Sequence, residues 1–211
     1  LTEEAPAKLE SQLEHMDWSY LDMIHNKEQQ RGTFSPLAAM EISEIEANKD
    51  KYLATGLDAV KNGKVGAILL AGGQGTRLGF DKAKGMFNIG KTKELYIFEQ
   101  LIANLMKVTN QAGKWVPLYV MTSEINDGMT REFFAEHDYF GYNKDYVKFF
   151  VQEMVPAVDF DGNLLMKSED SLAMSPNGNG GWFKSLINAG LDKDLKDKGV
   201  EWLNVFAVDN V

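Results

Sequence analysis

Residues 65–79 have the sequence VGAILLAGGQGTRLG. The first six form a continuous apolar run of strand length, and four of the next nine are glycine. A run without polar alternation is typical of a parallel strand that is buried on both faces. We therefore expect a buried strand over 65–70 that leads into a glycine-rich loop over 71–79.

Helical segments and short apolar runs alternate along the chain after this loop. The helical segments are 95–106, 130–136 and 182–189, and the apolar runs are 117–122, 147–152 and 202–208. Such alternation is typical of βαβ units and of a largely parallel sheet. The turn signal Asp161-Gly162-Asn163 adds a hairpin within 158–166. We expect an α/β fold with a Rossmann-like, mixed but mainly parallel sheet, flanking helices and a last buried strand that ends at Asp209-Asn210.

The first sixty residues have helical patterning instead. Apolar residues recur every three or four positions over 5–30. Ser35-Pro36 is typical of an N-cap and first helical position, and a third helix over 51–61 would end at Asn62-Gly63. We predict an N-terminal helical segment over 1–62 and an α/β domain over 63–211.

Composition excludes several classes of site. The 211 residues are 44% hydrophobic, which is enough for one ordinary core, and the net charge of −9 argues against nucleic-acid binding through a general basic surface. The absence of cysteine excludes disulfides, thiolate metal sites and a cysteine nucleophile. No apolar run approaches the roughly 20 residues of a membrane span, and the amino end has no signal-peptide pattern. We expect a cytoplasmic protein without a membrane partner, and the oligomeric state is left open.

Histidine and clustered aromatic residues are assigned ordinary roles. The three histidines, His15, His25 and His137, argue against a multi-histidine metal site and are expected at the surface or in packing. A run of aromatic residues is expected to pack at the edge of the core instead of forming a sugar-stacking platform: Tyr139, Phe140, Tyr142 and Tyr146.

The glycine-rich loop stands out by its charge. Residues 72–91 hold Arg77, Lys82, Lys84 and Lys91 against Asp81, a local charge of +3, which leaves −12 on the other 191 residues. Glycine lets backbone N–H groups approach a ligand, and arginine and lysine suit phosphate. Two interpretations stay open at this point: a polyphosphate site, or a tight turn followed by a solvated surface stretch.

Two familiar nucleotide-binding patterns are absent from this loop. The Rossmann spacing G-x-G-x-x-G fails because Leu78 stands where the third glycine would be. A P-loop would need Gly-Lys-Ser/Thr, which is missing. A nicotinamide-dependent oxidoreductase is therefore disfavoured.

Six motifs follow one another across residues 70–210. They are LAGGQGTRLG (70–79), KGM (84–86), FVQEMVPA (150–157), DG (161–162), MSPNGNGG (174–181) and FAVDN (206–210). Together they resemble the eukaryotic-type UDP-N-acetylhexosamine pyrophosphorylases, within the wider family of UTP:sugar-1-phosphate uridylyltransferases. The UDP-glucose branch typically has Asn-Gly-Gly in the loop and no arginine at the position of Arg77, so the chain is closer to the hexosamine and broad-specificity branches. Ala83 departs from the family pattern, which usually has proline there, and this leaves the assignment of Lys84 intact.

The resemblance implies a fold of the nucleotide-diphospho-sugar transferase type and a set of site residues. Nucleotide contacts are implied for Leu70, Ala71, Gly72, Gly73, Gly75, Thr76, Gln152 and Gly178. Gln152 would bind the uracil edge with its amide. Arg77 and Lys84 would be the catalytic cations, with Arg77 at the β- and γ-phosphates and Lys84 at the α-phosphate. Asn179 and Asn210 would contact the sugar or its phosphate, and Asp209 would bind Mg²⁺.

The reaction that the resemblance implies is uridylyl transfer from UTP to a sugar 1-phosphate, giving a UDP-sugar and pyrophosphate. N-acetylglucosamine 1-phosphate is the favoured acceptor, with glucose 1-phosphate and galactose 1-phosphate as alternatives. The family fold continues well past the strand over 202–208, so we expect the chain to be the first part of a larger catalytic fold. A fragment that binds nucleotide without turnover is a further alternative.

Overall fold

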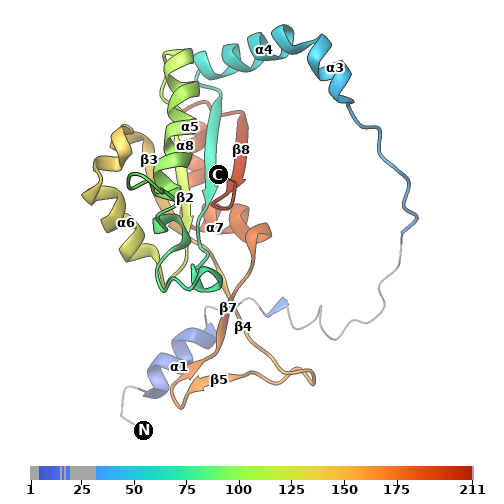
Figure 1. The fold of residues 1–211 in the computed structure, drawn as a ribbon. Helices are drawn as coiled ribbons and strands as arrows, with labels where there is room; N and C mark the ends of the chain where they lie inside the picture. Colours follow the sequence, from blue (N-terminus) through green and yellow to red (C-terminus); the bar gives the residue numbers. More distant parts are fainter. Residues whose placement is uncertain (1–4, 15, 17, 20–31, 211) are drawn as a thin grey trace. The chain divides into compact units, whose positions relative to one another are not determined.

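The structure, a computed structural model, describes residues 5–14, 16, 18–19 and 32–210 (Figure 1). The chain forms two compact units, one of Glu41–Glu153 with Gly178–Val211 and one of Leu1–Met40 with Met154–Asn177. The division differs from the expected boundary after residue 62, because Val60 is buried in the core of the larger unit. His15, His25 and the part of the first predicted helix over 20–30 lie outside the described residues.

The larger unit is built on a four-stranded parallel sheet with the order β3-β2-β1-β8. The strands are β1 (Val65–Leu70), β2 (Leu118–Thr122), β3 (Val147–Val151) and β8 (Trp202–Ala207). Five of the six residues of β1 are buried, which confirms the expected buried strand. Leu70 pairs with Met121 on one side and with Ala207 on the other, so β1, β2 and β8 end at nearly the same level.

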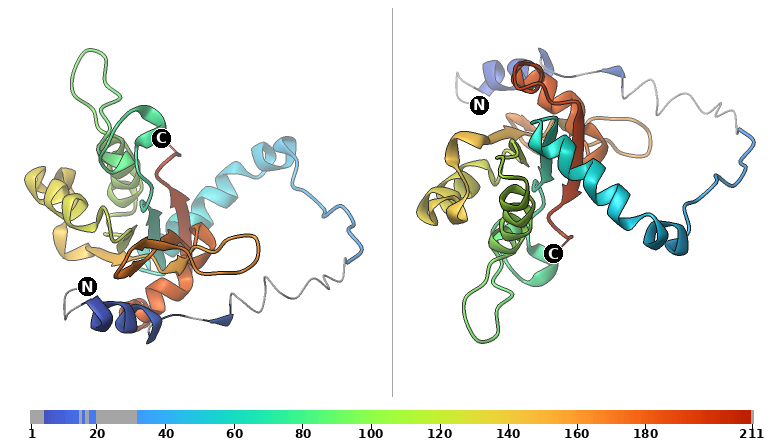
Figure 2. Two further views of the ribbon diagram at one scale, coloured as in Figure 1. Left: turned by 90° about the horizontal axis from the view of Figure 1, so that it is seen from below. Right: turned by 90° about the horizontal axis from the view of Figure 1, so that it is seen from above.

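Helices cover both faces of this sheet (Figure 2). Ala67 and Leu69 of β1 pack in one core cluster with α4, α5 and α6, whereas Ile68 and Leu70 pack in another with α7 and α8. Successive side chains of a strand point to opposite faces, which explains this alternation. The bounds are α3 (Ile42–Ala47), α4 (Lys49–Lys61), α5 (Ile97–Ala112), α6 (Asp127–Glu136), α7 (Trp182–Asn188) and α8 (Leu191–Asp197). The α/β fold with a parallel sheet and flanking helices is confirmed, while α8 had no clear sequence signal.

Short 3₁₀ turns connect several of these elements. They lie at Thr76–Leu78, Lys84–Met86, Asp138–Gly141, Lys144–Tyr146 and Asn179–Gly181. The first two stand in the glycine-rich segment after β1, and the last precedes α7. Among the residues that the structure describes, no helix is both long and apolar enough to cross a membrane.

The predicted helix that would start at Ser35-Pro36 is wrong. Residues 32–41 have no helical structure, and α3 begins only at Ile42. Phe34 and Leu37 are each 92% exposed, so the apolar face of such a helix would contact almost nothing. A short helix depends on packing of that face, which the local pattern alone does not supply. The third predicted helix is confirmed as α4, whose end is followed by Gly63 at φ 71°.

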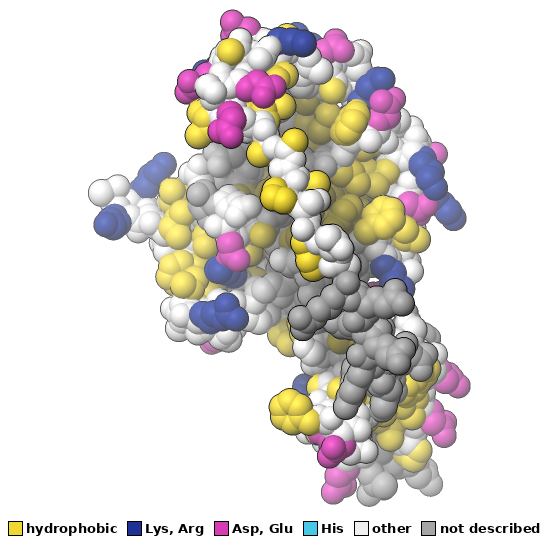
Figure 3. Space-filling view, turned by 90° about the vertical axis from the view of Figure 1, so that its right-hand side faces the viewer, with side chains coloured by type: hydrophobic (Ala, Val, Ile, Leu, Met, Phe, Trp, Pro, Cys, Tyr) yellow, Lys and Arg dark blue, Asp and Glu magenta, His cyan; other side chains and the backbone are white. Residues whose placement is uncertain are grey.

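The prediction that the last strand is buried is also wrong. β8 lies at the edge of the sheet with β1 as its neighbour, and Trp202 is 66% exposed. Figure 3, which views the molecule from the side on which β8 lies in Figure 1, shows hydrophobic side chains at the surface there. The apolar content of a run indicates a strand, but it does not tell an edge strand from a central one.

The smaller unit contains α1 (Ala5–Glu14) and two antiparallel strand pairs. β4 (Met154–Pro156) pairs with β7 (Met174–Pro176), and β5 (Met166–Ser168) pairs with β6 (Ser171–Leu172). The expected turn lies within this unit, where Val158 bridges Leu164 and the Asp159 carboxylate accepts the N–H groups of Asp161 and Asn163. The hairpin over 158–166 is therefore confirmed.

The histidine and aromatic residues near α6 have packing roles, as expected. The ring of His137 lies 4.1 Å from the ring of Phe133 between centroids, and its Nδ1 lies 2.8 Å from the Phe133 carbonyl oxygen. The aromatic run packs within or against the core cluster: Tyr139, Phe140, Tyr142 and Tyr146.

A network around Asp194 joins α8 to the sheet. The buried Tyr119 hydroxyl of β2 donates to its Oδ2 at 2.6 Å, and Lys148 of β3 and Lys198 donate to its Oδ1 at 2.7 and 2.6 Å. Partial burial alone would raise the pKa of Asp194, but these three hydrogen bonds outweigh it and lower the pKa to about 2. The carboxylate therefore stabilises the folded state while it is ionised.

Acid should remove this stabilisation. Because the pKa is lower in the folded than in the unfolded chain, the contribution is complete above the unfolded value of 3.8 and is lost as the pH falls toward about 2. After allowance for solvent screening, we expect the loss in unfolding free energy to be about 1–2 kcal/mol. Denaturant titrations from pH 5 to 2 should show this loss in the parent chain and not in Asp194→Asn. Asp197→Asn, at an exposed position of the same helix, is the control. If it reduced the pH dependence of the unfolding free energy as much as Asp194→Asn does, the assignment would be wrong.

Candidate functional site

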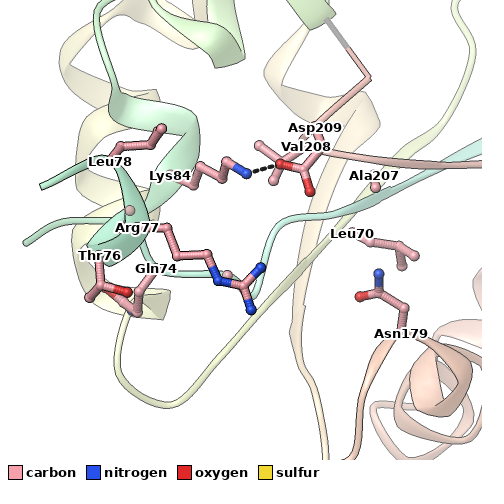
Figure 4. Close-up of a pocket in the computed structure, with 12 residues that line it drawn as sticks. Leu70, Gln74, Thr76, Arg77, Leu78, Lys84, Asn179, Ala207, Val208 and Asp209 are labelled. Atoms are coloured by element: carbon pink, nitrogen blue, oxygen red, sulfur yellow. Dashed lines mark ion pairs between the residues drawn. The ribbon is translucent and has the colours of Figure 1, made fainter. Parts of the chain in front are cut away.

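A pocket of about 370 Å³ opens at the carboxyl ends of β1 and β8. Its wall is made by the glycine-rich loop, the chain after β8 and one residue before α7. The lining residues are Leu70, Gly73, Gln74, Gly75, Thr76, Arg77, Leu78, Lys84, Asn179, Ala207, Val208 and Asp209 (Figure 4). Ligands of open α/β sheets bind beyond this end of the strands, so the position is that of a binding site.

Backbone hydrogen bonds give the glycine-rich loop a defined shape. The Ala71 N–H donates to the carbonyl of Met121 at 2.8 Å, which continues the pairing of β1 with β2 past the end of the strand. The loop is then closed on itself, because Gly75 N–H donates to Lys82 O at 2.9 Å and Lys84 N–H to Gly73 O at 3.2 Å. These bonds bring Lys84 back beside the start of the loop.

Only glycine fits at position 85, directly after Lys84. Gly85 is buried, and a Cβ atom at this position would overlap the ring of Phe98 in α5. The backbone after Lys84 therefore lies directly against the helix that covers the sheet. This contact fixes the origin of the lysine side chain, whose own exposed fraction is 29%.

Opposite charges meet inside the pocket. The Lys84 ammonium forms an ion pair with Oδ1 of Asp209, which lies two residues after the end of β8. The Arg77 guanidinium extends into the space between the loop and Asn179 (Figure 4). Two cations and one carboxylate thus face one small cavity, which suits an anion accompanied by a metal ion.

Gln152 lies at the end of β3 and packs against the loop from the side. It is 7% exposed, and its backbone N–H donates to Thr122 O at 2.8 Å. A Cβ atom on Gly72 would lie 2.6 Å from its Nε2 and 2.8 Å from its Cδ. The amide can approach the backbone this closely only because residue 72 is glycine.

The structure brings most of the expected site residues to the pocket. Those that line it are Leu70, Gly73, Gly75, Thr76, Arg77, Lys84, Asn179 and Asp209. Ala71, Gly72, Gln152, Gly178 and Asn210 are not part of the lining. Ala71 and Gly72 belong to the same loop, Gly178 and Asn210 each adjoin a lining residue in sequence, and the contacts implied for all of these residues stay predictions.

One residue that holds the loop was missed by the sequence analysis. Asn126 is completely buried between β2 and α6, and its Nδ2 donates to Ala71 O at 3.1 Å and to Gly73 O at 3.5 Å. An asparagine before a helix usually indicates an N-cap, so the pattern pointed to another role. Its place four residues after the expected strand over 117–122, at the end of the strand where ligands of such sheets bind, was the signal that could have found it.

The described residues could hold Mg²⁺ only together with a ligand. Among them, no group of three or more histidine, aspartate or glutamate side chains is placed to hold a metal ion. Asp209 supplies one carboxylate to the pocket, and its side chain is 60% exposed. Mg²⁺ commonly binds through one or two carboxylates plus phosphate oxygens and water, so this donor set fits a metal that arrives with a phosphate.

Comparison with known proteins shows the family of the chain. Residues 6–211 match the model of a family described as UTP–glucose-1-phosphate uridylyltransferase. The chain belongs to this family. The sequence resemblance to the UTP:sugar-1-phosphate uridylyltransferases is thereby confirmed.

Individual curated proteins and solved structures are similar over nearly the whole chain. The UDP-N-acetylglucosamine pyrophosphorylase of Saccharomyces cerevisiae is 34% identical over 98% of this chain and 44% of its own length. The structure of the uridine diphosphate N-acetylglucosamine pyrophosphorylase of Trypanosoma brucei in complex with an inhibitor has a TM-score of 0.78 and 27% identity, covering 99% of this chain and 47% of the other. A UDP-glucose phosphorylase from Trypanosoma brucei has a TM-score of 0.67 and 18% identity over 99% of this chain and 46% of the other, and shares the fold. The chain thus spans about half the length of the curated relatives it matches.

The close approach of Gln152 to Gly72 can be tested by a double-mutant cycle. Gly72→Ala should lower the unfolding free energy by about 1–3 kcal/mol, because the new methyl group displaces the amide. In a Gln152→Ala background the same change should cost almost nothing. Denaturant unfolding of the four proteins measures the coupling, and an equal loss in both backgrounds would show that the methyl group clashes elsewhere.

Proposed function

We propose that the chain carries the UTP-binding half of a uridylyltransferase that joins UTP and a sugar 1-phosphate. The observation that carries this proposal is the convergence of Arg77, Lys84 and Asp209 on one pocket beside the glycine-rich loop. Polyphosphate recognition needs cations and backbone N–H groups on a concave surface, and a metal ion needs a carboxylate nearby. That the nucleotide is UTP and the acceptor a sugar 1-phosphate is inferred from family membership.

The chemistry requires charge neutralisation and positioning more than proton transfer. A phosphate oxygen of the sugar 1-phosphate attacks the α-phosphorus of UTP, the bond from that phosphorus to the β-bridging oxygen breaks, and pyrophosphate leaves. The attacking oxygen is anionic at neutral pH, so no general base is needed. Lys84 and Arg77 would oppose the negative charge on the phosphates, and the loop backbone would hold them in place. Asp209 would help to hold Mg²⁺, which when bound would neutralise further phosphate charge.

N-acetylglucosamine 1-phosphate is the acceptor that we propose first. The relatives that are 33–34% identical over most of this chain bear the name of UDP-N-acetylglucosamine pyrophosphorylase or diphosphorylase. Glucose 1-phosphate and galactose 1-phosphate are the alternatives. Because the chain spans about half of those relatives, UTP binding without turnover is a second candidate function. The cytoplasmic location expected from the sequence stays a prediction.

A panel assay separates these candidates. The chain is supplied with UTP, Mg²⁺ and each of the three sugar 1-phosphates, and pyrophosphate release is measured; UTP binding is titrated in parallel by calorimetry. Release with N-acetylglucosamine 1-phosphate supports the first candidate, and UTP binding without release supports the second. If UTP does not bind, both candidates are wrong.

Loss of either pocket cation should weaken the binding of UTP and have little effect on the stability of the fold. Lys84→Ala and Arg77→Ala should each raise the dissociation constant of UTP about tenfold or more, because a charge-assisted hydrogen bond to phosphate is worth about 1.5–3 kcal/mol. Lys91→Ala is the matched control, since Lys91 belongs to the same basic segment but does not line the pocket. Calorimetry gives the affinities and thermal unfolding the stabilities. If all three substitutions weakened UTP binding equally, Lys84 and Arg77 would act only through the net charge of the segment and not through contacts in the pocket.

From the ion pair between Lys84 and Asp209 we expect Asp209→Asn to change how the affinity for UTP depends on Mg²⁺. Without metal, Asp209 competes with phosphate for the ammonium, so Asp209→Asn should bind UTP about as well as the parent chain or better. With Mg²⁺, the parent chain should gain affinity that the variant does not, because the carboxylate that would bind the metal is gone. Titrations of UTP in EDTA and in Mg²⁺ measure both effects. An equal gain from Mg²⁺ in both proteins would exclude Asp209 as a ligand.

A further inference from the structure

Asn126 links the turn after β2 to two separate carbonyl groups of the glycine-rich loop. Its Nδ2 donates to Ala71 O at 3.1 Å and to Gly73 O at 3.5 Å, and its Oδ1 accepts the N–H of Ser123 at 2.8 Å. The side chain is 0% exposed, so no water competes for these bonds from bulk solvent. The turn after β2 thus holds a loop that contains three glycines within residues 72–75.

The two carbonyl groups determine which way neighbouring N–H groups point. A trans peptide is planar, with its C=O and N–H on opposite sides. Fixing Ala71 O therefore orients the N–H of Gly72, and fixing Gly73 O orients the N–H of Gln74. Among the described residues, neither of these N–H groups has a hydrogen-bond acceptor. They are free donors directed away from Asn126.

Gly73 O also accepts the backbone N–H of Lys84 at 3.2 Å. The same carbonyl is thus held from one side by Asn126 and from the other by the residue whose ammonium pairs with Asp209. A shift of this peptide would move the Lys84 backbone as well as the loop. Asn126 reaches both parts of the pocket without lining it.

Helix capping does not account for Asn126. It precedes α6 at the N-cap position, yet its side chain makes no capping bond to that helix. Other hydrogen bonds hold the turn itself: Thr122 Oγ1 donates to Asp127 Oδ1 at 2.5 Å, and Asp127 N–H donates to Ser123 O at 2.9 Å. The amide is used for the loop instead.

We propose that Asn126 is a positioning residue for polyphosphate binding. It orients the N–H of Gln74, which lines the pocket, as a donor to a phosphate oxygen of a nucleoside triphosphate, and it keeps Lys84 in register with this donor. It also fixes the peptide of Gly72, which lies beside Gln152. This rests on the proposed function, because it assumes that the pocket binds UTP.

The test compares Asn126→Asp with Asp127→Ala. The first keeps the shape of the side chain but replaces its donor with a carboxylate facing two carbonyl oxygens; the second disrupts the same turn without touching the loop. Asn126→Asp should weaken binding of UTP with Mg²⁺ about tenfold, and Asp127→Ala less than about twofold at a comparable loss of thermal stability. Asn126→Ser, which keeps a smaller donor, serves if the aspartate variant fails to fold, and should give an intermediate loss. Unchanged affinity in the Asn126 variants overturns the proposal.

A second measurement needs no ligand. Amide hydrogen exchange at Gly75 and Lys84, whose N–H groups close the loop, should be faster in the Asn126 variant and unchanged in Asp127→Ala. Equal exchange in both variants overturns the positioning role even if UTP affinity falls. If the parent chain does not bind UTP, the proposed function fails, and exchange at these two residues still decides whether Asn126 holds the loop.

Discussion

Parallel pairing of β1 with both β2 and β8 is the constraint on which the site depends. Leu70 is level with Met121 and with Ala207, and the pairing continues by one bond on each side, from Ala71 N–H to Met121 O and from Val208 N–H to Leu70 O. The three strands therefore end at nearly the same level, on one edge of the sheet. A slip of one residue would move a strand by about 3.3 Å and separate Asp209 from Lys84.

The uneven charge of the chain has a physical basis in this arrangement. The basic segment over 72–91 carries +3, and the structure places two of its cations in one pocket with a carboxylate from the acidic remainder. Ion pairs between partly exposed side chains contribute little to stability, and here the exposed fractions are 29% for Lys84 and 60% for Asp209. Opening the pair therefore costs little, so a phosphate and a metal ion can take the two partners without a large penalty.

Sequence patterns predicted the elements that are encoded locally and missed what depends on neighbours. The apolar run of β1 and the glycine-rich loop were found because burial on both faces leaves a continuous signature. The helix at Ser35 was wrong because its cap signal is local, whereas its stability would have required a packed face. The burial of β8 was wrong for a related reason, since Trp202 is apolar but lies on a strand with a neighbour on one side. Asn126 was missed because its hydrogen bonds reach residues more than fifty positions away.

The lining of the pocket supports the proposed nucleotide recognition more than the proposed sugar recognition. Of its lining residues, all but Asn179 come from the loop and adjoining segment over 70–84 or from residues 207–209, and these supply cations, backbone and a carboxylate. Discrimination between an N-acetyl group and a hydroxyl requires donors and acceptors at fixed positions around the sugar ring, and the two amides of the lining, Gln74 and Asn179, are too few for that. The geometry therefore supports the proposed binding of a triphosphate with a metal ion, whereas the proposed preference for N-acetylglucosamine 1-phosphate rests on the names of the relatives. Within the described residues, the features that suit a phosphate lie at the sheet edge itself, and the proposed selectivity for the sugar would draw on contacts beyond this pocket.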